Sequence, residues 1–182
     1  YGDSPRTVQV GGGHASPGAP TAPAPVPASA YLLAADESGD LDTYGRVSNP
    51  TWRQLESALA ELEGASTALT YGSGMGAITS VLRVLTGPQT TLVVPADGYY
   101  QVRRYAAEYL ARQGVNVVEA TAAQMCDAAA DADVVLAATP VNPTLDVVDL
   151  HRLATLCRGL RSALVSANTA VLPTALPRPA VA

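Results

Sequence analysis

The sequence predicts an α/β fold in which a mostly parallel sheet is flanked by helices. Short β-branched runs alternate with helical patterns of about ten to fifteen residues, the spacing that βαβ crossovers require. Glycines and prolines mark the breaks between these segments. The chain has 182 residues, of which 48% are hydrophobic, so it is apolar enough to bury a core.

Two regions are expected along the chain. Residues 1–30 hold six of the 14 prolines and the run Gly11-Gly12-Gly13, a composition typical of a flexible Pro/Gly-rich N-terminal arm. Residues 31–182 are predicted to form the α/β domain. Because the first residue is Tyr1 rather than methionine, we expect a processed or excised piece of a longer protein.

The first helix of the domain is predicted from a strong start signal. Asn49 is a preferred N-cap residue and Pro50 suits the first helical position. Apolar residues then recur at helical spacing as far as Gly64. The other expected elements are, in chain order, a strand over 66–71, a helix with an apolar face over 78–85, a strand over 90–96, a helix over 99–112, a strand over 115–120, a helix over 121–132, a strand over 133–140, a helix over 146–158 and a strand over 162–169.

The composition argues against several classes of function. A net charge of −5 disfavours a sequence-independent grip on nucleic-acid phosphates. No stretch reaches the roughly 18 uninterrupted apolar residues that a membrane span needs. Cys126 and Cys157, with two histidines, make a poor zinc set and are interpreted as small core residues. The cytoplasm is the expected location.

One glycine-rich segment, Tyr71-Gly72-Ser73-Gly74-Met75-Gly76, falls between a predicted strand and a predicted helix. Glycines allow close approach to the backbone, and the start of a helix offers free N–H groups, so the segment suits a phosphate. It is not a Walker loop, because the chain contains no lysine. A phosphate cradle and a plain tight turn both remain open.

Three further places could contribute polar or aromatic contacts. Asn142 lies between two prolines after the strand over 133–140, and Tyr99 follows the strand over 90–96. Ligands of open α/β sheets collect at such carboxyl ends. Tyr44 and Arg46 precede the first helix on an irregular segment, where the arginine is free to meet an anion. Turn chemistry or surface exposure would also explain each of these residues.

Taken in order, these segments resemble the Cys/Met-metabolism family that depends on pyridoxal 5′-phosphate (PLP), the cystathionine γ-synthase and γ-lyase group of fold-type I enzymes. The resemblance runs from about Tyr44 to Thr169 and implies a partial fold-type I PLP-transferase large domain. Four motifs carry it in register: YGRVSNPTWRQLESALAELEGA, YGSGMGAI, VVPADGYY and ATPVNPTLDVVDL.

The resemblance implies specific roles in binding PLP. Tyr44 and Arg46 match residues that reach into a neighbouring subunit's site and hold the cofactor phosphate. Gly74 and Met75 match the backbone contacts of the phosphate loop, and Ser73 stands just before them.

The same resemblance places Tyr99 on the face of the pyridine ring and Asn142 on the ring hydroxyl. The glycine pair that usually follows the tyrosine is replaced by Tyr100 and Gln101, which is expected to alter the entrance at this point.

The pattern breaks at the last strand. The family carries V-D-N-T there, and its aspartate pairs with the pyridinium nitrogen. Here the segment is VSANT, so the aspartate position is Ala167. The chain also ends before the segment that carries the lysine to which PLP is bound, and no other lysine exists.

These losses lead us to expect a non-catalytic or half-site subunit of a hetero-oligomeric PLP enzyme, inactive alone. Its partner would be a homologous subunit that bears the lysine and holds PLP covalently. The reaction implied is elimination or replacement at the β or γ carbon of a small sulfur-containing or O-activated amino acid. Two alternatives stay open: a purely structural partner, and the N-terminal half of a split or larger C–S lyase.

Overall fold

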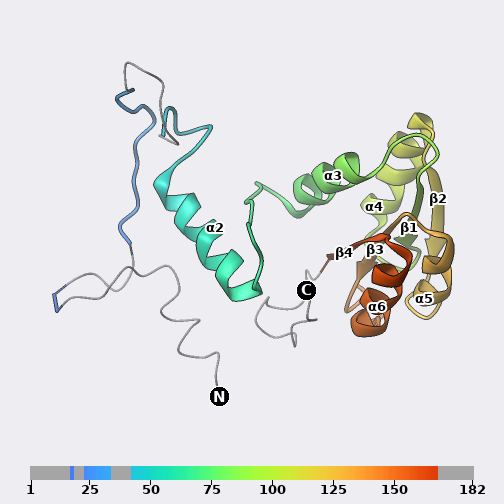
Figure 1. Ribbon diagram of the computed structural model, residues 1–182. Coiled ribbons are helices and arrows are strands. Elements are labelled where there is room, and N and C mark those ends of the chain that lie inside the picture. The colour runs from blue at the N-terminus through green and yellow to red at the C-terminus, as the bar shows by residue number, and fades with distance from the viewer. Residues whose placement is uncertain (1–16, 19–22, 34–41, 168–182) are drawn as a thin grey trace. The chain divides into compact units, whose positions relative to one another are not determined.

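The computed structural model describes residues 17–18, 23–33 and 42–167 (Figure 1). The chain divides into two compact units, Tyr1–Thr70 and Tyr71–Ala182, and each is described by itself. Asn168 and Thr169, the end of the last expected strand, lie outside the described residues. None of the helices described is long and apolar enough to cross a membrane.

The first unit is built around helix α2 (Pro50–Glu63), which the sequence predicts correctly. The Asn49 side chain accepts a hydrogen bond from the Thr51 N–H at 2.8 Å, and Gly64 ends the helix in the left-handed region at φ 65°. The Asn49 amide also donates to the carbonyl of Val26 at 2.9 Å. Asn49 therefore both starts α2 and ties residues 23–30 to it.

The strand expected over 66–71 is wrong. These residues form no strand, and no described strand pairs with them. Glu56 of α2 instead accepts from both the N–H and the hydroxyl of Thr70, at 2.7 and 2.8 Å. Leu69 is 70% exposed. The β-propensity of residues 66–71 does not produce a strand, because no described strand pairs with them.

The second unit contains a four-stranded sheet in which every pairing is parallel, with strand order β2-β1-β3-β4. The strands are β1 (Thr91–Pro95), β2 (Asn116–Ala120), β3 (Val134–Ala138) and β4 (Ala163–Ala167). The helical segments are α3 (Gly74–Leu85), α4 (Tyr100–Tyr105), the π-helical η1 (Ala106–Leu110), η2 (Ala111–Gln113), α5 (Met125–Ala128), η3 (Ala129–Asp131) and α6 (Leu150–Leu160).

Helices cover both faces of this sheet. Side chains alternate between faces along a strand, and on β1 Val93 belongs to one core cluster while Leu92 and Val94 belong to the other. The Val93 cluster includes buried residues of α5 and α6, such as Leu153. The opposite cluster includes residues of α3, α4 and η1, such as Leu82. The predicted α/β class with a parallel sheet is confirmed.

Three helices differ from their expected forms. The helix expected over 121–132 is the short α5 followed by the 3-10 segment η3. The helix over 99–112 is a succession of α4, η1 and η2, with a π-helical turn in its middle. The helix expected from Asp146 begins only at Leu150, because Asp149 caps it by accepting from the Arg152 N–H at 2.9 Å. The residues before it are held in a loop, where the Val148 N–H donates to the Thr139 hydroxyl at 3.1 Å.

Each core cluster should depend on its fully buried leucines, of which Leu82 and Leu153 are one from each cluster. We expect Leu82→Ala and Leu153→Ala each to lower the free energy of unfolding by about 2–5 kcal/mol, because both side chains are completely buried. Urea denaturation of the full chain measures this. Val84→Ala, at a position of α3 that is 84% exposed, is the control and should change little. Equal effects at Val84 and Leu82 would contradict the assigned core.

Candidate functional site

The carboxyl ends of three neighbouring strands meet at one edge of the sheet. β3 and β4 are in register, with Ala138 opposite Ala167, and the Thr139 N–H donates to the Ala167 carbonyl at 3.2 Å. β1 pairs with the other side of β3. The segments that lead to Tyr99 and Asn142 therefore leave the sheet at the same edge as Ala167, the usual position of a ligand in such sheets.

Helix α3 begins with an open anion-binding geometry. The Ser73 hydroxyl accepts from the Gly76 N–H at 3.0 Å, and the Ser73 carbonyl accepts from the Ala77 N–H at 3.1 Å. Among the described residues, no hydrogen bond uses the N–H groups of Gly74 and Met75. A Cβ built on Gly72 or Gly74 would meet no atom within 4 Å. Space and free donors thus fit a phosphate at this helix start.

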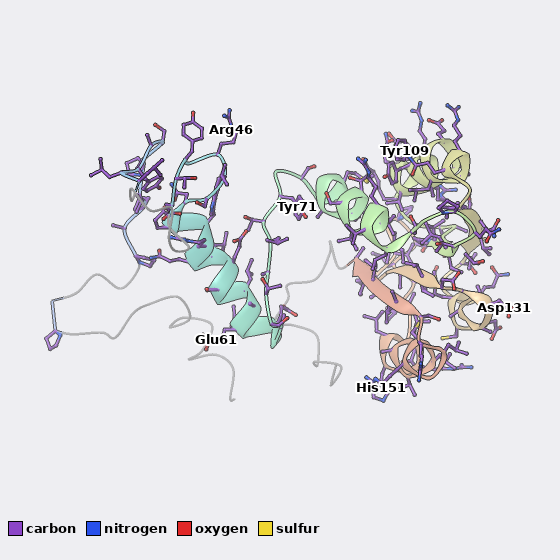
Figure 2. All side chains as sticks on the ribbon, turned by 45° about the horizontal axis from the view of Figure 1, so that its top comes forward. Arg46, Glu61, Tyr71, Tyr109, Asp131 and His151 are labelled. Carbon is purple, nitrogen blue, oxygen red and sulfur yellow. The ribbon has the colours of Figure 1, made fainter. Side chains whose placement is uncertain are left out.

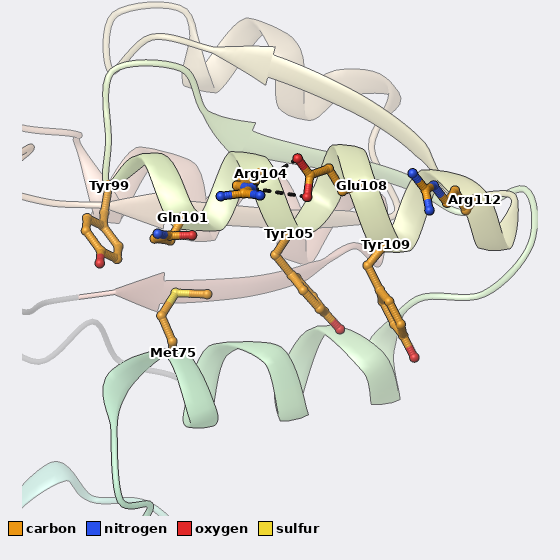
Figure 3. Close-up of a pocket in the computed structure, with 8 residues that line it drawn as sticks. All are labelled: Met75, Tyr99, Gln101, Arg104, Tyr105, Glu108, Tyr109 and Arg112. Atoms are coloured by element: carbon orange, nitrogen blue, oxygen red, sulfur yellow. Dashed lines mark hydrogen bonds and ion pairs between the residues drawn. The ribbon is translucent and has the colours of Figure 1, made fainter.

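Met75 and Tyr99 line one open groove of about 610 Å³ in the second unit (Figure 3). Met75 comes from the first turn of α3 and Tyr99 from the residue before α4. The structure therefore brings these two predicted cofactor contacts together. The remaining residues of the groove are Gln101, Arg104, Tyr105, Glu108, Tyr109 and Arg112.

Tyr99 presents an exposed ring on a fixed backbone. Its carbonyl accepts from the Val102 N–H at 3.1 Å. A Cβ on Gly98 would lie 2.9 Å from Pro95 Cγ, so the tight connection from β1 needs glycine at that position. Tyr99 is 53% exposed, and its ring meets the ring of Tyr100 in an edge-to-face arrangement, with centroids 5.2 Å apart. Such a ring is available to stack on a planar ligand.

Asn142 lies on a loop whose backbone is held by hydrogen bonds. The Val141 N–H donates to the Asp146 carbonyl at 2.8 Å, and the Leu145 N–H donates to the Val141 carbonyl at 2.7 Å. The Val141 side chain is buried, whereas Asn142 is exposed. No hydrogen bond of the described residues uses the Asn142 amide, which leaves it able to bind a polar ligand atom.

Tyr44 and Arg46 lie side by side in the first unit, just before α2. The Arg46 guanidinium lies over the Tyr44 ring, 4.9 Å from its centroid. The turn between them is held by the Gly45 N–H, which donates to the Ser29 carbonyl at 2.9 Å. A Cβ at Gly45 would come within 2.8 Å of the Ala28 carbonyl oxygen. Arg46 is exposed and, in the part of the chain that the structure describes, has no ion pair (Figure 2).

Apart from Arg104, which the sequence offered as a small basic spot with Arg103, the residues at the far end of the groove were missed by the sequence reasoning: Tyr105, Glu108, Tyr109 and Arg112. Arg104 makes a paired contact with Glu108, with Nε 3.0 and 3.1 Å from the two carboxylate oxygens. The rings of Tyr105 and Tyr109 stack at 5.2 Å. A three- and four-residue spacing continuing from Gln101 could have indicated this shared helix face.

Two titratable groups of this unit are shifted by burial. Burial raises the pKa of the Tyr105 hydroxyl above its usual value, and the nearby Arg83 opposes this in part. Burial also raises the pKa of the Cys157 thiol, so this buried cysteine stays protonated and suits the core rather than nucleophilic chemistry. No group of three or more His, Cys, Asp or Glu able to hold a metal occurs among the described residues.

Comparison with known proteins identifies the relatives of the chain. The family model described as "Cys/Met metabolism PLP-dependent enzyme" matches residues 7–180. A Streptomyces coelicolor protein that bears the name cystathionine gamma-lyase is 36% identical over 178 residues, which cover 94% of this chain and 45% of that protein. The L-methionine gamma-lyase of Streptomyces avermitilis is 36% identical over 141 residues, covering 75% and 32%.

The fold is shared with solved members of the same group. The crystal structure of cystathionine gamma synthase from Xanthomonas oryzae pv. oryzae superposes with a TM-score of 0.79 at 30% identity. That match covers 96% of this chain and 46% of the other. The chain therefore spans about half the length of this relative.

The start of α3 should depend on its serine cap. We expect Ser73→Ala to lower the free energy of unfolding by about 0.5–2 kcal/mol, because the Gly76 N–H loses its acceptor. Urea denaturation measures the change. Ser80→Ala, in the interior of the same helix, is the matched control and should not destabilise the chain. An equal loss in both variants would show that the cap contributes nothing.

Proposed function

The chain belongs to the Cys/Met-metabolism family of PLP-dependent enzymes, and from this premise we propose that it is a half-site subunit of a hetero-oligomeric enzyme. In this proposal the chain supplies non-covalent contacts to PLP, and a homologous partner supplies the lysine that holds PLP covalently. PLP, when bound, supplies the electron sink for carbanion chemistry on an amino acid.

The observation that carries the proposal is that the residues expected to hold PLP are present, whereas the lysine and the aspartate expected to take part in its chemistry are missing. The 182 residues contain no lysine, so the covalent link to PLP must come from outside them. Ala167 ends β4 at the ligand-binding edge of the sheet and has no carboxylate to offer a ring nitrogen. Both missing groups would have to be provided by another part of the assembly.

Each retained contact has a role in holding PLP. The free N–H groups of Gly74 and Met75, next to Ser73, would bind the phosphate at the start of α3. The exposed ring of Tyr99 would cover one face of the pyridine ring. The free amide of Asn142 would meet the ring hydroxyl. These residues bind and orient, and none of them transfers a proton.

Tyr44 and Arg46 are proposed to complete the partner's site in trans. An exposed guanidinium without an ion pair, oriented by the aromatic ring beside it, is suited to bidentate contact with a phosphate. The glycine-dependent turn at Gly45 fixes where the two side chains leave the backbone. The pair would therefore reach a partner's phosphate with little loss of conformational freedom.

The proposed reaction is elimination or replacement at the β or γ carbon of a small sulfur-containing or O-activated amino acid. Relatives named cystathionine gamma-lyase, methionine gamma-lyase and cystathionine gamma-synthase support this class.

A second candidate follows from the length of the match. Because the chain spans about half of its relatives, it can equally be the N-terminal part of a longer or split C–S lyase. Ala167 argues against a longer or split lyase, because the active site of such an enzyme would need another residue to supply the carboxylate for the ring nitrogen. The length of the co-purifying polypeptide discriminates the two: a full-length family member supports the half-site subunit, and a half-length chain supports the split enzyme.

The half-site role predicts a specific effect of Arg46 on the complex. We expect Arg46→Ala to weaken PLP binding about 10- to 100-fold and to reduce turnover accordingly, since a charge-assisted contact to phosphate is lost. Visible absorbance of the lysine-bound cofactor in the co-purified complex measures the binding.

Arg152→Ala, which removes one exposed arginine from α6, is the matched control and should leave PLP binding unchanged. Unaltered binding and turnover in Arg46→Ala would rule out completion in trans and leave a purely structural partner. A colourless chain that purifies without any partner would overturn the hetero-oligomer altogether.

A further inference from the structure

We propose that Tyr100 and Gln101 form a clamp that fixes the ring of Tyr99 in position for stacking on a planar aromatic ligand. The inference rests on the proposed function, in which Tyr99 covers the pyridine ring of PLP. Tyr100 and Gln101 are positioning residues, because they act through Tyr99 and not on the ligand.

The first contact of the clamp is aromatic. The rings of Tyr99 and Tyr100 are 5.2 Å apart between centroids and inclined at 66°, the edge-to-face geometry that aromatic pairs favour. Tyr99 is more than half exposed, so few other groups restrict its side-chain torsions. The ring of Tyr100 is therefore a main restraint on where the Tyr99 ring lies.

The second contact holds Tyr100 itself. The Gln101 Nε2 donates a hydrogen bond to the Tyr100 hydroxyl at 2.8 Å. Gln101 is partly buried and lines the groove beside Tyr99 and Met75 (Figure 3). The hydrogen bond thus links a residue of the groove wall to the ring that restrains Tyr99.

The backbone beneath the clamp is already fixed. The Val102 N–H holds the Tyr99 carbonyl, and the close packing of Gly98 on Pro95 sets the turn that leads to it. Only the side-chain torsions of Tyr99 remain to be restricted, which is the part that the clamp supplies.

The clamp is a departure of this chain from the pattern that it resembles, which has a glycine pair after the tyrosine. Glycines can make neither of the two contacts. A pre-oriented ring loses less entropy on binding, and this matters more where Ala167 offers the ring nitrogen no carboxylate. The stacking contact with Tyr99 then contributes a larger share of the binding free energy of the pyridine ring.

The experiment uses the full chain and pyridoxine 5′-phosphate, which lacks the aldehyde and so reports non-covalent binding alone. Nuclear magnetic resonance of the tyrosine rings gives two readouts: the cross-relaxation between the Tyr99 and Tyr100 rings without ligand, and the dissociation constant from a titration. We expect Tyr100→Leu to abolish the ring contact and weaken binding about 3- to 10-fold.

Two further variants isolate the hydrogen bond. Tyr100→Phe keeps the ring and removes the acceptor, and Gln101→Ala removes the donor. We expect each to weaken binding by less than Tyr100→Leu, and the double variant to equal either single one, because both remove the same interaction. His151→Ala, on the exposed surface of α6, should bind as the unmodified chain does.

The outcomes separate the clamp from the proposed function. Binding that is weakened by Tyr99→Leu and unaltered by Tyr100→Leu would overturn the clamp and leave the cofactor site standing. An unmodified chain with an intact Tyr99–Tyr100 contact that binds no pyridoxine 5′-phosphate would overturn the cofactor site, and with it the positioning role.

Discussion

The parallel ladder of β1, β3 and β4 is the constraint on which the second unit depends. Five residue pairs join β3 to β4, from Val134–Ala163 to Ala138–Ala167, and β1 is held on the other side of β3. Because the strands are parallel, their carboxyl ends meet at one edge, and the loops to Tyr99 and Asn142 begin there. The two-sided apolar character of β1 and β3 brings helices onto both faces. The groove between α3 and α4 is a consequence of this packing.

Much of this architecture could be predicted from sequence because its signals are local. The Asn49–Pro50 start and Gly64 end of α2, and the buried runs of β1 and β3, are set by residues close together in the chain. The strand expected over 66–71 was wrong because a strand needs a neighbour, and the Glu56–Thr70 contact that replaces it joins residues 14 apart. The π-helical turn of η1, which accompanies the stacking of Tyr105 on Tyr109, leaves no pattern in the sequence.

The candidate site also contains some features that could be predicted from the sequence and others that could not. The resemblance to the family implied Met75 and Tyr99 as cofactor contacts, and the structure brings them into one groove. Their meeting requires only that a strand, a turn and a helix follow one another at fixed lengths. The contact of Tyr100 with Gln101 depends on the rotamers of two neighbouring side chains, which no spacing encodes. For Tyr44 and Arg46, the sequence predicts a function in another subunit, and the structure of one chain gives their local arrangement: a guanidinium held over a ring.

On the proposed function, Ala167 would separate the binding of PLP from its chemistry. Phosphate contacts, stacking and an amide can hold and orient a pyridine ring, but none of them favours the protonated form of its nitrogen. A nearby carboxylate typically contributes about 1.4–4 kcal/mol to that protonation, and the protonated ring is the stronger electron sink. On that proposal, alanine in place of aspartate at the end of β4 would leave the binding contacts in place and remove the carboxylate that favours the protonated ring. On the proposed function, selection would act on how well this chain fits a partner subunit and the cofactor. The side chains that would make those contacts, Arg46, Tyr99 and Tyr100, are exposed.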